Sequence, residues 1–238
     1  SFAMLRADDY GVRAIFRVCG GGGKSAGCPD GIYLMESPIE PANRLQRIEL
    51  AGAGLRFAPK WLSRAEANAL FASLRDTIVW ETHRIRMFGR MIDSPRLSCW
   101  IGDPGAGYTY SRTRFEPHPW PEVLVPMRMR LQEALGAPFN SVLANRYRDG
   151  RDHMGWHSDD EPELGPQPII ASLSLGATRR FALKPRGDGE RLGLDLSHGS
   201  LLVMDGGTQT RYRHALPATQ RPVGERINLT FRHILLAD

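Results

Sequence analysis

Two histidines and one aspartate carry the clearest chemical pattern in this sequence. His157 and Asp159 are separated by one residue, and His214 follows much later in the chain. This order matches the two-histidine, one-carboxylate arrangement that binds non-haem Fe(II) through one face of the ion and leaves positions for O2 and a second ligand. A His-x-Asp pair also arises by chance, so the interpretation needs support from the neighbouring segments.

The segment before these residues is typical of a rigid support for a metal ion. Ser141–Arg148 alternates apolar and polar residues, which predicts a β-strand. Asp149 and Gly150 then interrupt the pattern as a turn does, and we expect the metal dipeptide on irregular chain. In an extended segment, side chains two residues apart point to the same side, so His157 and Asp159 could reach one ion.

A different pair of histidines offers an alternative. His153 and His157 have the spacing of a zinc-binding pair on a helix. Gly150, Gly155 and the surrounding Asp and Arg residues disfavour a helix there. The iron interpretation is therefore preferred.

A second chemical pattern lies near the C-terminus, where residues 226–232 alternate strictly between polar and apolar. One strand face then carries Arg226, Asn228, Thr230 and Arg232. On an outer surface this would be an ordinary solvated face, but inside a barrel the two arginines would need anions. A five-carbon diacid could place one carboxylate on each guanidinium, with hydrogen bonds added by Asn145 and Tyr147 on the strand at 141–148.

The predicted elements that position these groups are two helices followed by strands. Ser63 with Glu66 forms a capping box that opens a helix ending near Asp76. Its expected core face is Leu62, Ala65, Ala69, Leu70 and Leu74. A second helix opens at Pro119–Glu122, with Pro121 in its first turn, and ends at Gly136. Its expected apolar contacts are Val123, Leu124, Met127, Met129 and Leu131.

From residue 141 onward the chain reads as all-β. The expected strands are 141–148, 168–175, 179–184, 190–197, 200–205, 210–216 and 225–234. Many short strands with turns between them indicate a jelly roll, and the two helices would cover one outer sheet face. We therefore predict an α+β fold with a double-stranded β-helix (jelly roll) core.

Aromatic and basic residues between the helices favour nucleic acid as a partner. Tyr108 and Tyr110 lie on one face of a predicted strand, near Arg96, Arg112 and Arg114, a mixture that stacks bases and holds phosphates. A half-buried strand would explain the same tyrosines. Phe88, beside Gly89 and Arg90, is either a core residue or a wedge that probes a base stack.

Composition and charge agree with an intracellular, nucleic-acid-binding protein. The chain of 238 residues has a net charge of +5, and only three of its 31 basic residues are lysines. Arginine suits bidentate phosphate contacts, although codon bias would produce the same excess. The three cysteines lack zinc spacing, and we see neither a signal peptide nor an apolar run long enough for a membrane span. We expect a cytoplasmic protein, in the bacterial cytoplasm or nucleoid if the source is prokaryotic, that acts as a monomer away from membranes.

The N-terminal region carries no chemistry that we can identify. Gly20–Ser25 resembles a phosphate-binding loop, but Val18 occupies the position of a required glycine. A glycine-rich connector is the better interpretation. Ile32–Met35 could form a short strand.

The motifs together resemble the AlkB family of Fe(II)/2-oxoglutarate dioxygenases over residues 57–235. The matching segments are Asn145-Arg-Tyr147, His157-Ser-Asp-Asp-Glu161, Pro168-Ile-Ile-Ala-Ser172, His198-Gly-Ser-Leu-Leu202, His214 and Arg226-Ile-Asn-Leu-Thr-Phe-Arg232. The sequence looks closest to the branch of the two animal DNA-repair homologues. Tyr108–Ser111 and Trp156–Pro162 are more like the single-strand homologue, whereas Phe88–Arg90 is more like the wedge of the double-strand homologue.

The resemblance implies a role for each candidate residue. His157, Asp159 and His214 would hold Fe(II). The co-substrate 2-oxoglutarate would be bound by Asn145, Tyr147, Arg226, Asn228, Thr230 and Arg232. A flipped base would stack between Tyr110 and His157, in a pocket lined by Tyr108, Thr109, Asp160 and Glu161. Trp80 would lie near the lesion, and Phe88 would fill the gap left by the base in a duplex.

The implied activity is oxidative demethylation of N-alkylated bases, such as N1-methyladenine and N3-methylcytosine, with release of formaldehyde. Iron, 2-oxoglutarate and O2 would be required, and the partner would be methylated single- or double-stranded DNA or RNA. Residues 1–45 would be an N-terminal extension of unknown role, 46–140 a nucleotide-recognition region and 141–238 the catalytic core. The alternatives are the same oxygenase chemistry on a protein or small molecule, and a non-catalytic β-sandwich that binds nucleic acid.

Overall fold

The computed structural model describes residues 44–87, 90–110 and 113–235. The side chains of 85–92 and 108–115 also lie outside the description. The predictions for Gly20–Ser25, Ile32–Met35 and Phe88, and almost all of the proposed extension 1–45, therefore fall outside the described residues. All described residues belong to one compact unit, Glu40–Asp238.

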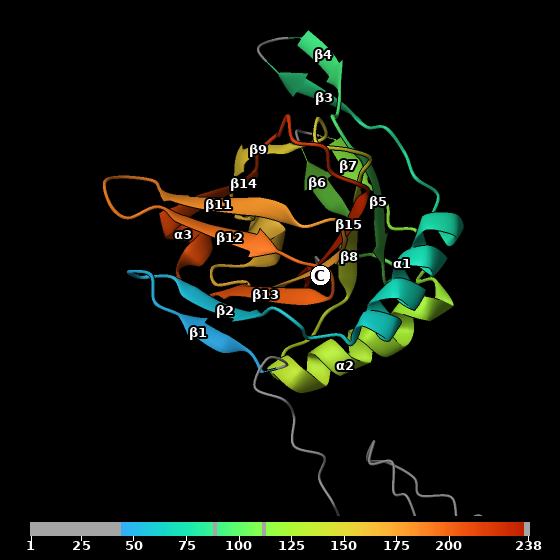
Figure 1. The fold of residues 1–238 in the computed structure, drawn as a ribbon, viewed down its shortest axis with the longest axis horizontal. Helices are drawn as coiled ribbons and strands as arrows, with labels where there is room; N and C mark the ends of the chain where they lie inside the picture. Colours follow the sequence, from blue (N-terminus) through green and yellow to red (C-terminus); the bar gives the residue numbers. More distant parts are fainter. Residues whose placement is uncertain (1–43, 88–89, 111–112, 236–238) are drawn as a thin grey trace, which may run out of the picture. The chain divides into compact units, whose positions relative to one another are not determined.

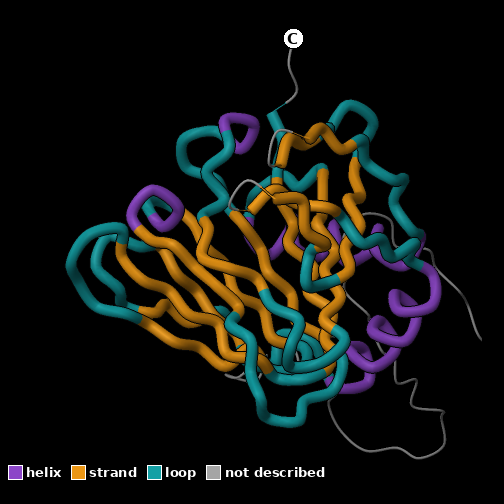
Figure 2. The backbone as a smooth tube through the Cα atoms, turned by 90° about the horizontal axis from the view of Figure 1, so that it is seen from above, coloured by secondary structure: helices purple, strands orange, loops and turns teal. Residues whose placement is uncertain are grey.

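Two antiparallel sheets face each other and form the core of the fold (Figures 1 and 2). The larger sheet has the strand order β1-β2-β13-β10-β15-β8-β5, and the smaller sheet has the order β12-β11-β14-β9. Two short hairpins, β3-β4 and β6-β7, lie before and after β5 in the sequence. This is the predicted jelly roll, an antiparallel double-sheet architecture.

The strands of the larger sheet are β1 (Gln46–Ile48), β2 (Gly54–Ala58), β5 (Leu97–Gly102), β8 (Ser141–Tyr147), β10 (Ile170–Gly176), β13 (Ser200–Asp205) and β15 (Arg226–Arg232). Those of the smaller sheet are β9 (Met154–His157), β11 (Arg179–Pro185), β12 (Leu192–Leu196) and β14 (Tyr212–Leu216). The hairpins are β3 (Arg84–Met87), β4 (Arg90–Asp93), β6 (Tyr108–Tyr110) and β7 (Thr113–Phe115).

Both helices pack on the outer face of the larger sheet (Figure 1). Helix α1 (Arg64–Thr77) begins with the predicted capping box, in which Ser63 and Glu66 exchange hydrogen bonds. Its buried residues are Ala67, Leu70 and Leu74. The prediction was wrong for Ala65 and Ala69, which are exposed, because the buried face of this helix runs through Ala67.

The second helix forms as a short 3-10 turn, Glu122–Leu124, followed by α2 (Val125–Leu135). It ends at the predicted Gly136, which adopts a left-handed conformation with φ of 61° that favours glycine. Leu124 and Leu131 are buried as expected, but Met129 is 64% exposed because it points away from the sheet. No helix among the described residues is long and apolar enough to cross a bilayer.

The predicted strands of the second half are present, with two local corrections. Thr210 and Arg211 belong to a short helix, α3 (Thr208–Arg211), so the strand begins at Tyr212. His157 is the last residue of β9, whereas irregular chain was expected there. Because His157 is paired within a sheet, its position is fixed more firmly than a loop would fix it.

Strand β15 lies in the interior of the larger sheet, between β10 and β8, and all seven of its residues are buried. Ile227, Leu229 and Phe231 contribute to the core beneath the helices. The alternate residues point toward the smaller sheet and line a cavity between the two sheets. The strict alternation therefore serves two buried surfaces, an apolar core and a polar cavity.

Candidate functional site

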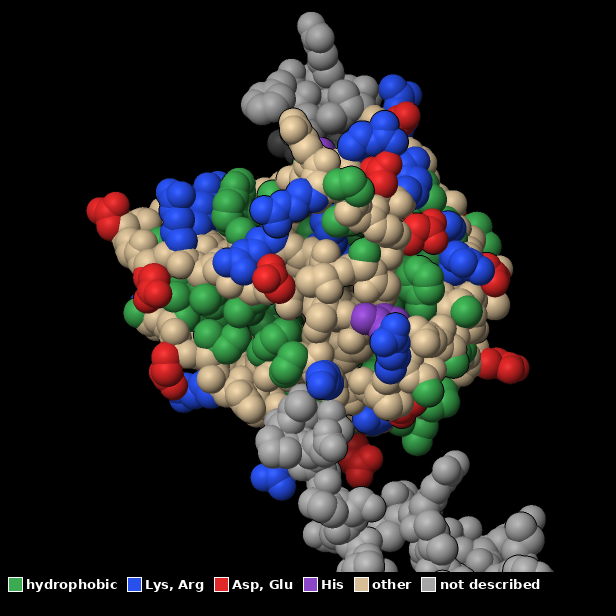
Figure 3. Space-filling view, in the orientation of Figure 1, with side chains coloured by type: hydrophobic (Ala, Val, Ile, Leu, Met, Phe, Trp, Pro, Cys, Tyr) green, Lys and Arg blue, Asp and Glu red, His purple; other side chains and the backbone are tan. Residues whose placement is uncertain are grey.

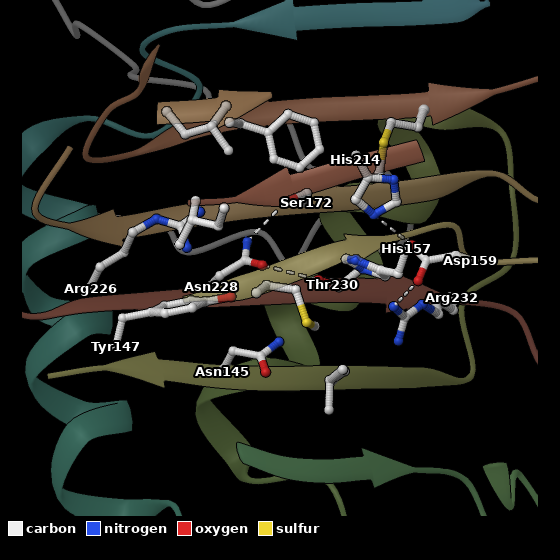
Figure 4. Close-up of a pocket in the computed structure, with 16 residues that line it drawn as sticks. Asn145, Tyr147, His157, Asp159, Ser172, His214, Arg226, Asn228, Thr230 and Arg232 are labelled. Atoms are coloured by element: carbon white, nitrogen blue, oxygen red, sulfur yellow. Dashed lines mark hydrogen bonds and ion pairs between the residues drawn. The ribbon is translucent and has the colours of Figure 1, made fainter. Parts of the chain in front are cut away.

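The three predicted metal ligands converge at one end of the cavity between the sheets (Figure 4). The candidate ligand atoms of His157, Asp159 and His214 all lie within 4.8 Å of one another. The antiparallel pairing of β9 with β14 places His157 opposite His214, and their ring centroids are 4.2 Å apart. Asp159 lies two residues beyond the end of β9, and this spacing brings its carboxylate to the same point.

The two histidines are held in the neutral form that a metal ion requires. His157 Nδ1 lies 2.8 Å from the carbonyl oxygen of Gly155. Since a carbonyl can only accept, Nδ1 carries the hydrogen, which leaves the Nε2 lone pair available. Burial lowers the pKa of His157, and burial together with the nearby His157 ring lowers the pKa of His214 to about 3. Neutral imidazoles donate lone pairs to metal ions.

Asp159 is buried but remains an anion. Burial acts to raise its pKa, but the Arg232 guanidinium and the two histidines outweigh that effect and hold the pKa of Asp159 below its usual value. Arg232 Nη2 donates to Oδ1 over 2.6 Å, and Oδ2 lies 3.7 Å from His214 Nε2. The backbone N–H of Asp159 donates to the side chain of Gln209. One carboxylate and two neutral imidazoles are a donor set that fits Fe(II).

Arg226 lies at the far end of the cavity from this cluster (Figure 4). Its Nη2 donates to Ser174 Oγ over 2.9 Å, while Nε and Nη1 are buried without a hydrogen-bond partner among the described residues. Burial lowers the pKa of Arg226 to about 10, and the phenol of Tyr147 acts in the opposite direction. Burying a guanidinium that has two nitrogens without hydrogen-bond acceptors is energetically costly unless an anion binds it.

Polar side chains between the two arginines form a connected wall of the cavity. Asn228 Nδ2 donates to Ser172 Oγ over 2.8 Å, and Thr230 Oγ1 donates to Asn228 Oδ1 over 3.1 Å. Asn145 lies directly opposite Asn228 in the pairing of β8 with β15. The guanidinium of Arg226 lies over the ring of Tyr147, with 5.2 Å between Arg226 Cζ and the ring centroid. These contacts fit an elongated diacid lying between Arg226 and Arg232.

The residues predicted to contact a base do not gather in the cavity as the candidate iron and 2-oxoglutarate residues do. Asp160 forms an ion pair with Arg186, and Glu161 is half-buried just before a 3-10 turn. Trp80 packs against the core on the helix side of the larger sheet and is not among the residues that line the cavity. The backbone of Tyr108, Thr109 and Tyr110 forms β6. The side chains of those three residues, and all of Phe88, lie outside the described part of the chain.

Several residues that contribute to the site were missed or misread in the sequence. Arg96 was expected near phosphates, but only 6% of it is exposed, and its Nε donates to Asn145 Oδ1 over 2.8 Å. Ser172 and Ser174, on β10, hold Asn228 and Arg226. The alternation of residues 170–176 could have indicated that both serines face the cavity. Nothing in the sequence distinguishes a buried Arg96 from a surface one.

A jelly roll that holds a two-histidine, one-carboxylate cluster beside a buried arginine pair defines a class of iron-dependent oxygenases. The family model described as the 2OG-Fe(II) oxygenase superfamily matches residues 54–232. The chain belongs to this superfamily and, within it, to the AlkB family. It is a dioxygenase that uses Fe(II), 2-oxoglutarate and O2.

The similar proteins include two kinds of AlkB homologue. The mouse DNA oxidative demethylase ALKBH2 is 42% identical over 183 residues, covering 72% of this chain and 77% of the relative. The bovine alpha-ketoglutarate-dependent dioxygenase alkB homolog 3 is 40% identical over 186 residues, covering 74% of this chain and 64% of the relative. The chain therefore spans slightly less than two thirds of that second protein.

The solved structures agree with the fold. The structure of OsALKBH1 superimposes with a TM-score of 0.54 at 18% identity, covering 80% of this chain and 100% of the other. A 2OG-Fe(II) oxygenase family oxidoreductase from Burkholderia pseudomallei gives a TM-score of 0.52 at 16% identity, covering 75% of this chain and 84% of the other. At such low identity these structures support the jelly roll alone.

Proposed function

We propose that this protein removes methyl groups oxidatively from alkylated bases in DNA, with N1-methyladenine and N3-methylcytosine as substrates and RNA as a second polymer. The observation that carries the proposal is the candidate ligand cluster at one end of a cavity. The other end of the cavity holds the buried guanidinium of Arg226, whose Nε and Nη1 have no hydrogen-bond partner among the described residues. Relatives named DNA oxidative demethylase support the choice of substrate.

In this proposal each end of the cavity has a separate task. His157, Asp159 and His214 hold the iron, and Arg232 keeps the Asp159 carboxylate ionised and oriented. Arg226 binds the far carboxylate of 2-oxoglutarate. Bound iron supplies, with 2-oxoglutarate and O2, the oxidising power to hydroxylate an N-methyl C–H bond. The resulting N-hydroxymethyl group loses formaldehyde and leaves the unmodified base.

The chain's own residues then favour a cationic base near the iron. Asp160 and Glu161 follow immediately after the candidate ligand Asp159. N1-methyladenine and N3-methylcytosine are positively charged, so a carboxylate at close range stabilises them, by about 4 kcal/mol at 4 Å for an effective dielectric constant of 20. Arg186 holds Asp160 in one orientation. The same methyl groups block Watson–Crick pairing, which makes these bases easier to extrude.

A mass-spectrometric assay tests the proposal. A 15-nucleotide DNA carrying one N1-methyladenine is incubated with protein, Fe(II), 2-oxoglutarate and air, as single strand, as duplex and as the RNA equivalent. We expect loss of one CH2 from the oligonucleotide, abolished in His214→Ala and unchanged in Met129→Ala, whose side chain is exposed on α2. Succinate formation without demethylation of any of the three polymers would instead assign the oxygenase to a protein or small molecule.

We further infer a monomer that works in the cytoplasm. A ferrous enzyme needs a reducing compartment, and the described cysteine Cys99 is a free, buried thiol, as expected there. Sedimentation of the protein with and without a single-stranded oligonucleotide tests the oligomeric state. A protein dimer at micromolar concentration would contradict this part of the proposal.

A further inference from the structure

Trp156 is a large apolar side chain that the fold leaves 44% exposed. It immediately precedes the candidate ligand His157 on β9, where the pairing of β9 with β14 is irregular between Met154 and His157. Met154 and His157 line the cavity, whereas Trp156 does not, and its exposed ring lies on the outer face of the smaller sheet. The core therefore does not explain why a tryptophan occupies this position.

The tryptophan ring extends across the sheet toward a lysine. Lys184 Nζ lies 4.4 Å from the ring centroid of Trp156. Lys184 is on β11, and β14 lies between β11 and β9, so about 10 Å of sheet separates the two backbones. Lys184 follows the buried Leu183 and pairs opposite Arg213, which precedes the inward-facing His214. All three side chains therefore share the outer face.

This outer face is positively charged around the ring. None of the carboxylates in the described residues forms an ion pair with Lys184 or Arg213, whereas Arg180 on the same strand as Lys184 is paired with Asp195. Figure 3 shows Lys and Arg side chains gathered over β11. Two residues beyond Lys184, Arg186 reaches Asp160 beside the candidate ligand cluster, so the basic face adjoins the site.

We propose that Trp156, Lys184 and Arg213 form a platform that binds the single strand flanking the target base, with one base stacked on the Trp156 ring. The inference rests on the proposed function and extends it to a surface outside the cavity. A base can take the place of the ammonium on the ring face, and Lys184 then moves to a neighbouring phosphate. Only unstacked bases offer a free face to a protein ring, so the occupant is single-stranded nucleic acid.

The test measures binding without turnover. Fluorescein-labelled, unmodified single-stranded DNA of 15 nucleotides is titrated under nitrogen with the full chain loaded with Mn(II). Binding is followed by fluorescence anisotropy. Removing one stacking interaction by Trp156→Ala should weaken binding of the 15-mer by roughly 5- to 150-fold. Trp156→Phe, which keeps a ring, should lose less than Trp156→Ala, and Met129→Ala should not change binding.

The charge part of the platform has its own readout. Lys184→Gln should lower the slope of log affinity against log salt concentration by about 0.7, the value for one phosphate contact on a single strand. For the 15-mer substrate, KM should rise in Trp156→Ala by more than kcat falls. Co(II) titration of both variants checks that the adjacent metal site is intact.

The outcomes separate the two proposals. Equal 15-mer affinity and equal salt slopes in wild type, Trp156→Ala and Lys184→Gln would overturn the platform even if demethylation is confirmed. If no demethylation is found but Trp156→Ala still weakens 15-mer binding, the result supports the platform and contradicts the proposed reaction. Displacement of the 15-mer by poly-glutamate as effectively as by unlabelled DNA would also overturn it, since it would indicate an acidic protein partner.

Discussion

Replacing Arg226 by methionine should stabilise the protein in the absence of 2-oxoglutarate and abolish its response to that ligand. Burial lowers the pKa of Arg226 from its ordinary value to about 10, which corresponds to about 3 kcal/mol against the charged form. That cost is present at every pH below about 10 and fades above it, since the folded protein releases the proton before the unfolded chain does. An assay at pH 7.5 therefore measures all of it.

The loss of other contacts offsets part of the stability gained in Arg226→Met. The methionine variant loses the hydrogen bond from Arg226 to Ser174, worth about 1 kcal/mol, and part of the contact with Tyr147. A net gain of about 1–2 kcal/mol corresponds to roughly 2–8 °C in Tm for a domain of this size. Wild type at 2-oxoglutarate concentrations near 100 times Kd should gain about 3 kcal/mol, and the variant nothing.

Differential scanning calorimetry with Mn(II), with and without 2-oxoglutarate, measures both effects. Arg226→Lys is the matched control, because it keeps the charge but not the two-pronged geometry, and it should retain a small ligand-induced shift. If Arg226→Met lowers Tm in the absence of ligand yet keeps the full 2-oxoglutarate shift, the guanidinium is structural and the reasoning fails.

Three further changes follow from the same contacts. Asp159→Ala should reduce Co(II) affinity by more than about 100-fold in a spectroscopic titration, because it removes the only anionic ligand of the cluster, and wild-type affinity would contradict the assignment. Without metal, the protein should lose stability as pH falls below 6.5, since the unfolded chain takes up protons on His157 and His214 that the folded state excludes, and for His214 this loss continues to about pH 3. The free energy of unfolding from urea denaturation should fall by about 1 kcal/mol per histidine for each pH unit. A free energy that does not change with pH would show that both rings take up protons in the folded protein as readily as in the unfolded chain. Ser63→Ala should cost about 1 kcal/mol through loss of the α1 cap, and an unchanged urea midpoint would refute that value.

The parts of the fold that were predictable are those where one local rule decides. Strict alternation at 226–232 indicated a strand whatever surrounded it, and the capping box at Ser63 located the start of α1. The face of α1 was less predictable. Alanine packs equally well at a core margin or in solvent, so the sequence could not distinguish Ala65 and Ala69 from the buried Ala67.

The site was predictable where residue type alone implies chemistry, and not where chemistry depends on burial. The candidate iron ligands and the arginine pair could be identified from their order and spacing taken together with the strand patterns around them. Arg96 and Ser174 have ordinary residue types, and only the pairing of β8 with β5 and of β10 with β15 brings them to Asn145 and Arg226. Long-range strand pairing is the information that a local pattern does not contain.

Arg232 connects the two halves of the site through one guanidinium. It donates to the Asp159 carboxylate, and it lies on the same strand face as Arg226. A diacid spanning the cavity would therefore meet a group that already neutralises a metal ligand. A metal ion bound to Asp159 would neutralise that carboxylate and leave the Arg232 charge available to the diacid, so iron and 2-oxoglutarate should each strengthen the binding of the other, and by the same factor. In this proposal the alternation of β15 would determine where the co-substrate lies and how strongly its binding depends on the metal.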